Sequence, residues 1–354
     1  MRIVFTRRRH LVPILLLSVL TGLFVRVSPA VADAVVDVVD RTELLESRVI
    51  VRDPAAREPG RVAPPVTDPA PAPEPVESAP VTRPGISGEV RVDAGFDDAP
   101  TGTLTAATLR TQFETHGAHV PYAESKSLSA LSVVANPEGS GRVLKARIPA
   151  GQTGGVMNFP VNIIQDGPGY DEAYLSYRLR FGDRFDFSPW GGKLPGLAGG
   201  PSKGNLNKVF PAGCNDVTGD NGFSARGMWN SNLSGTKGIP ILDQYVYHKN
   251  KTHNCGDPMP YAGASGPSEL QANRWYGITH RVVMNDPGKR NGVVEAWVDG
   301  EKVLSRSNLE FRNTRDWGIN VLYMAGFFGG KDSNWTHDRV EDMYYDDFVV
   351  HAVR

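Results

Sequence analysis

The chain has 354 residues, a formal net charge of −1 at pH 7, and charged side chains at 22% of its positions. A net charge so close to zero gives no support for a nucleic-acid-binding protein, because such proteins carry clustered basic residues. The length allows one large domain or two ordinary ones.

The amino terminus has the order of a secretory signal peptide. Three arginines at residues 7–9 precede an apolar run over residues 11–25, and the small residues at 30–32 offer a cleavage site. The apolar run is too short for a comfortable membrane span. We therefore assign residues 1–32 to a signal peptide and expect a secreted protein with no membrane association after cleavage.

Residues 33–87 are rich in proline, with stretches such as PPVTDPAPAPEPVESAP. A segment of this composition buries too little apolar surface to offset the entropy lost on ordering. We expect a disordered, extended linker that joins the signal peptide to one domain at residues 88–354.

Short alternating segments fill this domain and predict an all-β fold. They are separated by Gly, Pro, Asn and Asp clusters, and Asp299-Gly300 is a strong hairpin turn signal. No repeat of fixed period occurs, which disfavours a propeller or a solenoid. The clearest strands are residues 173–181, 222–229, 243–248, 275–285, 293–304 and 343–353. We expect a β-jelly roll, an antiparallel sandwich of two sheets with a concave groove on one of them.

Three of these segments place polar residues on one side of each strand. The side chains concerned are Arg178 and Arg180 in the first segment, Ser224 and Arg226 in the second, and Tyr245 and Tyr247 in the third. If these sides line one sheet, they form a groove rich in cations and phenols. Arginine binds carboxylates bidentately, and tyrosine stacks on sugar rings and transfers protons. Taken singly, an alternating arginine is usually solvated and a Tyr-x-Tyr pair is commonly a half-buried surface.

A glycine-rich segment, GGKLPGLAGG at residues 191–200, adds Lys193 where the backbone can approach a ligand closely. Its spacing does not match a phosphate-binding loop. Trp190 precedes it as a possible sugar platform.

Together, these motifs resemble polysaccharide lyase family 14, the jelly-roll alginate and glucuronan lyases. The resemblance is carried by YLSYRLRF, KLPG, GFSARGMW, YVY, EAWVDGEKVL and the tail AGFFGGKDSNW…YYDDFVV. It implies an enzyme acting on an acidic polysaccharide, with Lys193, Ser224, Arg226, Tyr245 and Tyr247 lining the catalytic cleft. We add Arg178, Arg180 and Trp190 as substrate-binding residues.

Such a lyase removes the proton on C5 of a uronate and expels O4 by β-elimination. Arg226 and Lys193 would neutralise the charge that builds at the carboxylate, with Ser224 as a hydrogen-bond donor. Tyrosine can transfer the protons if nearby cations lower its pKa, and we expect Tyr247 to be the principal residue, assisted by Tyr245. The reaction needs no metal or organic cofactor, and we expect a monomer.

Two cysteines, Cys214 and Cys255, predict one disulfide in an exported protein. The disulfide would join two loops that both adjoin the predicted cleft, so substrate identity stays open among alginate and glucuronan polymers.

Two other functions use the same fold. A jelly-roll glycoside hydrolase would need a pair of carboxylates at suitable separation, and the laminarinase-like pattern E-x-D-x-x-E does not occur. A non-catalytic carbohydrate-binding module would use tryptophans as platforms, although we expect Trp229 to lie in the core. The acidic residues at the carboxyl terminus could hold a structural calcium ion. They are Glu341, Asp342, Asp346 and Asp347.

Overall fold

The computed structural model describes residues 85–86, 88–121, 123, 128–201, 211–233, 235–330 and 332–354. The predicted signal peptide, and all of the predicted linker except residues 85 and 86, lie outside these ranges. Within them, no helix has the length and apolar character needed to cross a membrane.

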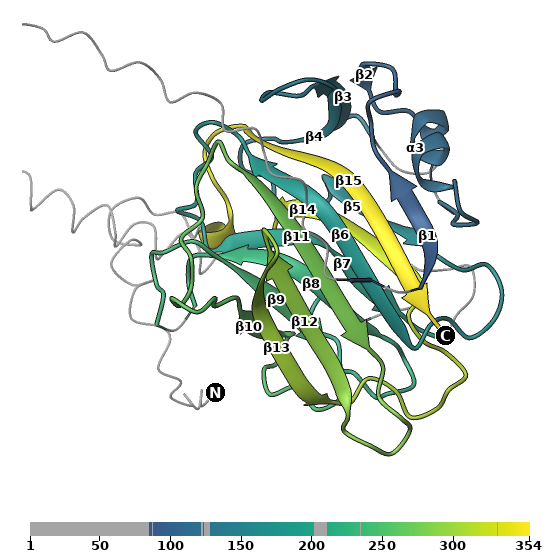
Figure 1. Cartoon of the computed structure of the whole chain (residues 1–354). Coiled ribbons are helices and arrows are strands. Elements are labelled where there is room, and N and C mark those ends of the chain that lie inside the picture. The colour runs from purple at the N-terminus through teal and green to yellow at the C-terminus, as the bar shows by residue number, and fades with distance from the viewer. Residues whose placement is uncertain are drawn as a thin grey trace, which may run out of the picture. The chain divides into compact units, whose positions relative to one another are not determined.

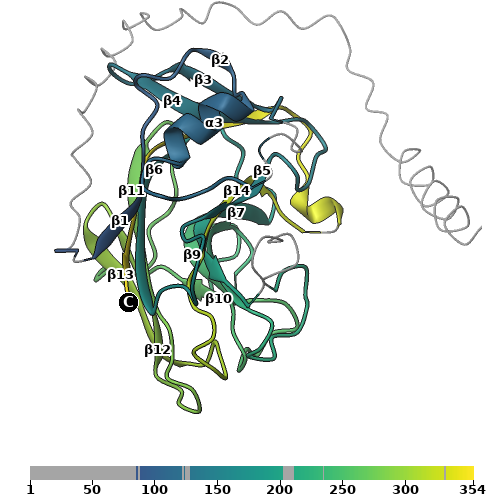
Figure 2. The same cartoon turned by 90° about the vertical axis from the view of Figure 1, so that its right-hand side faces the viewer.

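Two antiparallel sheets, packed face to face, make up the described domain (Figures 1 and 2). The nine-stranded sheet has the order β13-β12-β11-β6-β15-β4-β3-β2, and β1 pairs with β15. Its strands are β1 (Glu89–Ala94), β2 (Gly102–Thr103), β3 (Leu131–Ala135), β4 (Arg142–Ile148), β6 (Glu172–Phe181), β11 (Trp275–Val283), β12 (Gly292–Val298), β13 (Glu301–Leu309) and β15 (Glu341–Val353). These two layers confirm the predicted β-jelly roll.

The six-stranded sheet has the order β10-β9-β8-β7-β14-β5. Its strands are β5 (Met157–Asn162), β7 (Gly191–Gly199), β8 (Phe223–Asn230), β9 (Ile241–Tyr247), β10 (Asp257–Pro260) and β14 (Val321–Phe328). One α-helix, α3 (Ala106–Phe113), and a 3₁₀ turn, η2 (Ser333–Trp335), complete the described elements.

The core lies between the two sheets, where alternate residues of each strand meet. In β6 the inward set is Leu175, Tyr177, Leu179 and Phe181, all fully buried, as the period of two predicts. Trp229 of β8 is also in the core and packs edge-on against Phe181. The expectation that Trp229 is a core residue is therefore confirmed.

A tight hairpin joins β12 to β13 at the predicted turn. Asp299 and Gly300 both have positive φ, 51° and 85°, which is the backbone conformation that a two-residue type I′ turn requires. Asp299 also accepts a hydrogen bond from the backbone N–H of Gly277 through its carboxylate, at 2.8 Å, and so ties the turn to β11.

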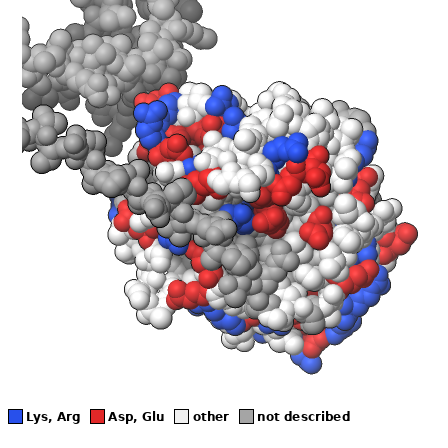
Figure 3. Space-filling model, turned by 45° about the horizontal axis from the view of Figure 1, so that its top comes forward, with Lys and Arg blue, Asp and Glu red and all other residues white. Residues whose placement is uncertain are grey.

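Charged side chains of both signs are interspersed over the face shown in Figure 3. This distribution agrees with the near-zero net charge of the chain. Sheet-surface arginines commonly take carboxylate partners. For example, Arg281 contacts both Glu172 and Glu295, at 2.7 and 2.8 Å.

Candidate active site

Three adjacent strands, β7, β8 and β9, carry the five residues expected in the catalytic cleft. The register places Arg226 opposite Tyr245, and Ser224 opposite Tyr247. Lys193 lies opposite Met228, which is two residues after Arg226 in β8. These residues alternate with core residues such as Ala225 and Val246, so they share the face of the six-stranded sheet that points away from the nine-stranded sheet. We call this face the outer face.

The glycine-rich segment of Lys193 forms β7, a central strand of the six-stranded sheet. Pro195 has no N–H to give to a ladder, and the register with β8 shifts between Lys193 and Gly196. This bulge places two residues of β7 against one of β8. As a result Lys193 and Gly196, three positions apart, both lie on the side of Arg226.

Lys193 is buried on the outer face. Its Nζ donates to Sδ of Met228 at 2.9 Å, lies 4.0 Å from the centre of the Tyr245 ring, and is 5.6 Å from the Trp335 ring. Burial lowers the pKa of Lys193 from its usual value, and the neighbouring charge of Arg226 lowers it further, against an opposing effect of Asp243.

Asp243 is a residue of this site that the sequence analysis did not find. It is fully buried, on the same side of β9 as the tyrosines and two positions before Tyr245. Burial raises its pKa, while Lys193 and the Asn230 side chain act in the opposite direction. The signal was present in the segment DQYVYH, whose period of two places Asp243 beside both tyrosines.

The two tyrosine rings stand nearly perpendicular, with centroids 5.5 Å apart. The hydroxyl oxygen of Tyr247 accepts the backbone N–H of Cys214 at 3.1 Å, and that of Tyr245 accepts the N–H of Gly256 at 3.0 Å. Burial, and then Tyr247, raise the pKa of Tyr245, which outweighs the lowering effects of the Gly256 N–H and of Arg226. Arg226 thus acts on the pKa of Tyr245 in the expected direction, but burial outweighs it.

Arg226 and Ser224 complete the group. The Arg226 guanidinium carbon lies 5.0 Å from the centre of the Tyr323 ring, and its Nε has no hydrogen-bond partner among the described residues. Ser224 donates to the carbonyl oxygen of Pro211 at 3.0 Å. Tyr323, from β14, donates to Oδ1 of Asn158 at 2.7 Å and was also missed by the sequence analysis.

Arg178 and Arg180 lie elsewhere, which corrects the assumption that their strand shares the sheet of the other two. Strand β6 belongs to the nine-stranded sheet. Arg178 packs over the Trp275 ring at 4.6 Å. Arg180, only 2% exposed, bonds to Asp183 at 2.8 Å and to Asn273. Alternation identifies the two faces of a strand but not the sheet that the strand joins. The pattern therefore could not show that Arg178 and Arg180 belong to the other sheet.

Trp190 contacts Trp335, and Trp335 contacts Lys193 of the group. Its ring packs edge-on against Trp335, with centroids 5.7 Å apart, and Trp335 in turn lies over Lys193. A cavity of about 490 Å³ lies beside Trp190, with Phe187, Lys237 and Glu269 among its lining residues.

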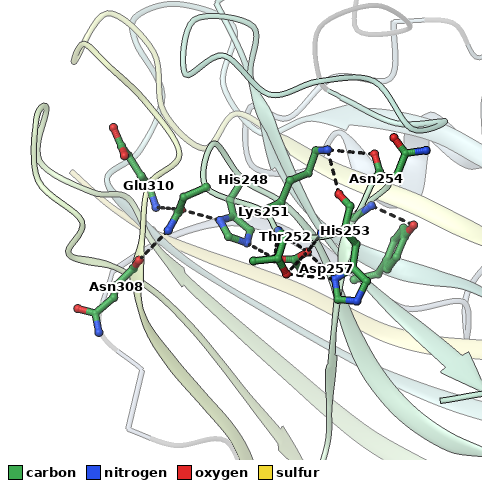
Figure 4. A network of polar contacts seen from close by, with 11 residues as sticks. His248, Lys251, Thr252, His253, Asn254, Asp257, Asn308 and Glu310 are labelled. Atoms are coloured by element: carbon green, nitrogen blue, oxygen red, sulfur yellow. Dashed lines mark hydrogen bonds and ion pairs between the residues drawn. The ribbon is translucent and has the colours of Figure 1, made fainter. Parts of the chain in front are cut away.

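The predicted disulfide is confirmed, since Cys214 and Cys255 are bonded to each other. The loop before Cys255 folds around the carboxylate of Asp257. Nε2 of His248 lies 2.9 Å from this carboxylate, and the backbone N–H groups of Thr252 and His253 donate to it (Figure 4).

Two acidic residues of β15 take basic partners. Asp342 forms two hydrogen bonds with Arg147, both at 2.9 Å, and Glu341 accepts one from Arg339 at 2.7 Å. Among the described residues, no group of three or more His, Cys, Asp and Glu side chains is arranged to hold a metal ion.

Comparison with solved structures finds alginate lyases of similar fold. The alginate lyase Aly36B superposes with a TM-score of 0.59 at 22% identity, covering 74% of this chain and 97% of that one. A marine PL-14 alginate lyase from Aplysia kurodai has a TM-score of 0.57 at 19% identity, covering 74% and 99%. At these identities the likeness establishes the fold. No curated protein sequence matches the chain.

The sequence model of one protein family, described as polysaccharide lyase 14, matches residues 136–348. This range includes β7, β8 and β9, and with them all five residues of the outer-face group. Because the match extends over more than half of the chain, the protein belongs to polysaccharide lyase family 14 and is a polysaccharide lyase.

Proposed function

We propose that this lyase cleaves a uronic-acid-containing polysaccharide, alginate or glucuronan, by β-elimination between C5 and O4. The observation that carries the proposal is the cluster of two cations, one hydroxyl and two phenols on the outer face. The similar Aly36B variant has been solved in complex with an alginate tetrasaccharide, at 19% identity and a TM-score of 0.59. The amino-terminal sequence supports a secreted enzyme, which we propose acts as a monomer.

The cations serve the first part of the reaction. The C5 proton of a uronate is hard to remove while the adjacent carboxylate is negative, because the carbanion-like state adds further charge there. Arg226, with a buried Nε that has no partner among the described residues, would take the carboxylate, and Lys193 would neutralise it from β7. Ser224 would add a hydroxyl donor after exchanging its bond to Pro211.

The tyrosines divide the proton transfers. Burial raises the pKa of Tyr245, so this hydroxyl keeps its proton and suits the acid that protonates the leaving O4. Tyr247 is then the base that removes the C5 proton. The product carries a conjugated C4=C5 double bond, and the scheme requires no metal or organic cofactor.

The test is an ultraviolet assay for the conjugated product with alginate, polymannuronate, polyguluronate and glucuronan. Tyr247→Phe should lower kcat by about 10²- to 10⁴-fold, since it removes the proton acceptor. Arg226→Ala should lower kcat/KM by about 10²- to 10³-fold, since it removes charge stabilisation. Two matched controls lie away from the site and should retain activity. Tyr174→Phe changes a residue of β6 in the nine-stranded sheet, and Arg274→Ala changes the residue that precedes β11.

Two results would contradict the proposal. Reducing ends released without ultraviolet absorbance would mean hydrolysis. Binding to one polymer without any product from the parent enzyme would mean a carbohydrate-binding role.

A further inference from the structure

The disulfide lies directly beside the two tyrosines of the site. Its two cysteines belong to separate loops, and each loop brings one backbone N–H to one tyrosine hydroxyl oxygen. Cys214 itself donates to Tyr247 at 3.1 Å, and Gly256, the residue after Cys255, donates to Tyr245 at 3.0 Å. The covalent bond therefore joins the two donors that hold the two phenols.

The loop that leads to Cys255 is held by several hydrogen bonds. The carboxylate of Asp257 accepts the N–H groups of Thr252 and His253 at 2.9 and 2.8 Å and contacts His248 (Figure 4). Gly256 lies against both phenol rings, because a Cβ added there would approach the Tyr247 ring to 2.8 Å and the Tyr245 ring to 3.0 Å. These contacts hold the N–H of Gly256 in a fixed position.

Cys214 has a backbone conformation that is unfavourable for a residue other than glycine. Its φ is 69°, in the left-handed region that residues other than glycine rarely adopt, and it follows Gly213 with φ 61°. Such a conformation persists only where the surrounding structure imposes it. In this conformation Cys214 is bonded to Cys255, and its N–H donates to Tyr247.

An N–H donated to a phenol oxygen has two effects. It fixes the direction in which the remaining hydroxyl proton and lone pair point, and it favours the phenolate over the phenol. Both effects act on groups that must exchange protons with substrate atoms at short range, where small displacements cost turnover.

We propose that the Cys214–Cys255 disulfide is a positioning element of the active site, which aims Tyr247 and Tyr245 through the N–H groups of Cys214 and Gly256. This inference rests on the proposed function, because it assumes that these tyrosines transfer the protons. Opening the disulfide then lowers kcat while KM changes little, since the cations that bind the substrate carboxylate lie on β7 and β8.

The experiment compares the parent enzyme, untreated and reduced with dithiothreitol, with the double variant Cys214→Ser/Cys255→Ser. Thiol titration verifies reduction, and circular dichroism verifies folding. We expect kcat to fall by about 10- to 100-fold on reduction and in the variant, with KM within about twofold of the parent. The variant itself should be insensitive to dithiothreitol, which excludes an effect of the reductant elsewhere. A reduced, folded enzyme with the kcat of the parent would overturn the inference.

A second measurement needs neither activity nor a folded double variant. Amide hydrogen exchange by NMR should show faster exchange at Cys214 in Tyr247→Phe and at Gly256 in Tyr245→Phe, with the other amide unchanged in each case. Unchanged exchange at both amides would overturn the inference while leaving the lyase function intact. No ultraviolet product from the parent with any polymer would remove the proposed function, and this inference with it.

Discussion

Lys193 and Asp243 place opposite charges in one buried part of the outer face, and each alters the ionisation of the other. Burial disfavours both charged forms, so it lowers the pKa of Lys193 and raises that of Asp243, whereas their mutual attraction acts against both shifts. An acidic residue near the cleft of an enzyme for polyanions would repel its substrate if it stood alone. Here it helps Lys193 to keep its proton.

Asp243→Asn tests this relation. Without the carboxylate, the pKa of Lys193 falls further, because Asp243 is what raises it. Lys193 then loses its charge at lower pH, and the alkaline limb of kcat/KM for the acidic polymer moves to lower pH. We expect a loss of about tenfold near ~pH 8 and a smaller loss in acid, measured as a pH profile with the ultraviolet assay. Asp166→Asn, at an exposed position, is the control, and a profile identical to the parent's would contradict the relation.

At the scale of elements, strand β7 decides the geometry of the site. It lies between β8 and β14, every residue in it is buried, and its glycines allow the neighbouring backbone to come close. A Cβ added at Gly196 would collide with the carbonyl of Ala225 and the Cα of Arg226. Because these are backbone atoms, β8 itself would have to move.

Gly196→Ala should therefore reduce both stability and activity. We expect about 1 to 3 kcal/mol of destabilisation from overpacking, and a decrease in Tm of about 2 to 4 °C for each kcal/mol. The displacement of Arg226 should lower kcat/KM as well. Gly95→Ala, where the nearest atoms are 4.0 Å away, should leave thermal unfolding and the ultraviolet assay near the parent values. Equal Tm values for the two variants would count against the close packing of β7.

Alternation along single strands was enough to predict the strand faces that carry Ser224, Arg226, Tyr245 and Tyr247, because the period of two is a local property. Lys193 was singled out by its glycine-rich segment, and the family resemblance assigned it to the cleft. The membership of β6 in the other sheet depends on pairing with distant strands, which no local pattern contains. Tyr323 and Trp335 join the site for the same reason, from segments far along the chain.

At the scale of the whole molecule, a polar chain links the two sheets through the core. His280 of β11 lies 2.9 Å from the hydroxyl of Tyr261, which donates to Gln244 of β9. Burial lowers the pKa of His280 to about 3. The unfolded chain has an ordinary histidine pKa near ~6.5. Between these two pKa values, His280 is therefore protonated in the unfolded chain and neutral in the folded state.

This difference sets a direction for acid unfolding. The stability from a neutral His280 is complete above the unfolded pKa and is lost as the pH falls toward the folded pKa. Between about pH 6.5 and 5 the loss is roughly 2 kcal/mol, or about 4 to 8 °C in Tm. His280→Gln should flatten the dependence of Tm on pH over this range, and His116→Gln, at an exposed position, should not. Parallel curves for parent and His280→Gln would refute the assignment.

The place of β15 has a consequence for how the domain is made. This last strand lies inside the nine-stranded sheet, between β6 and β4, and also pairs with β1 from the start of the domain (Figure 1). Contacts between such distant positions form slowly, because the entropy of closing a long loop is lost before the contacts stabilise the fold. During synthesis, the nine-stranded sheet stays open until β15 has left the ribosome. The strands that precede β15 must therefore wait for it, and a truncation that removes β15 would leave a sheet with exposed interior edges.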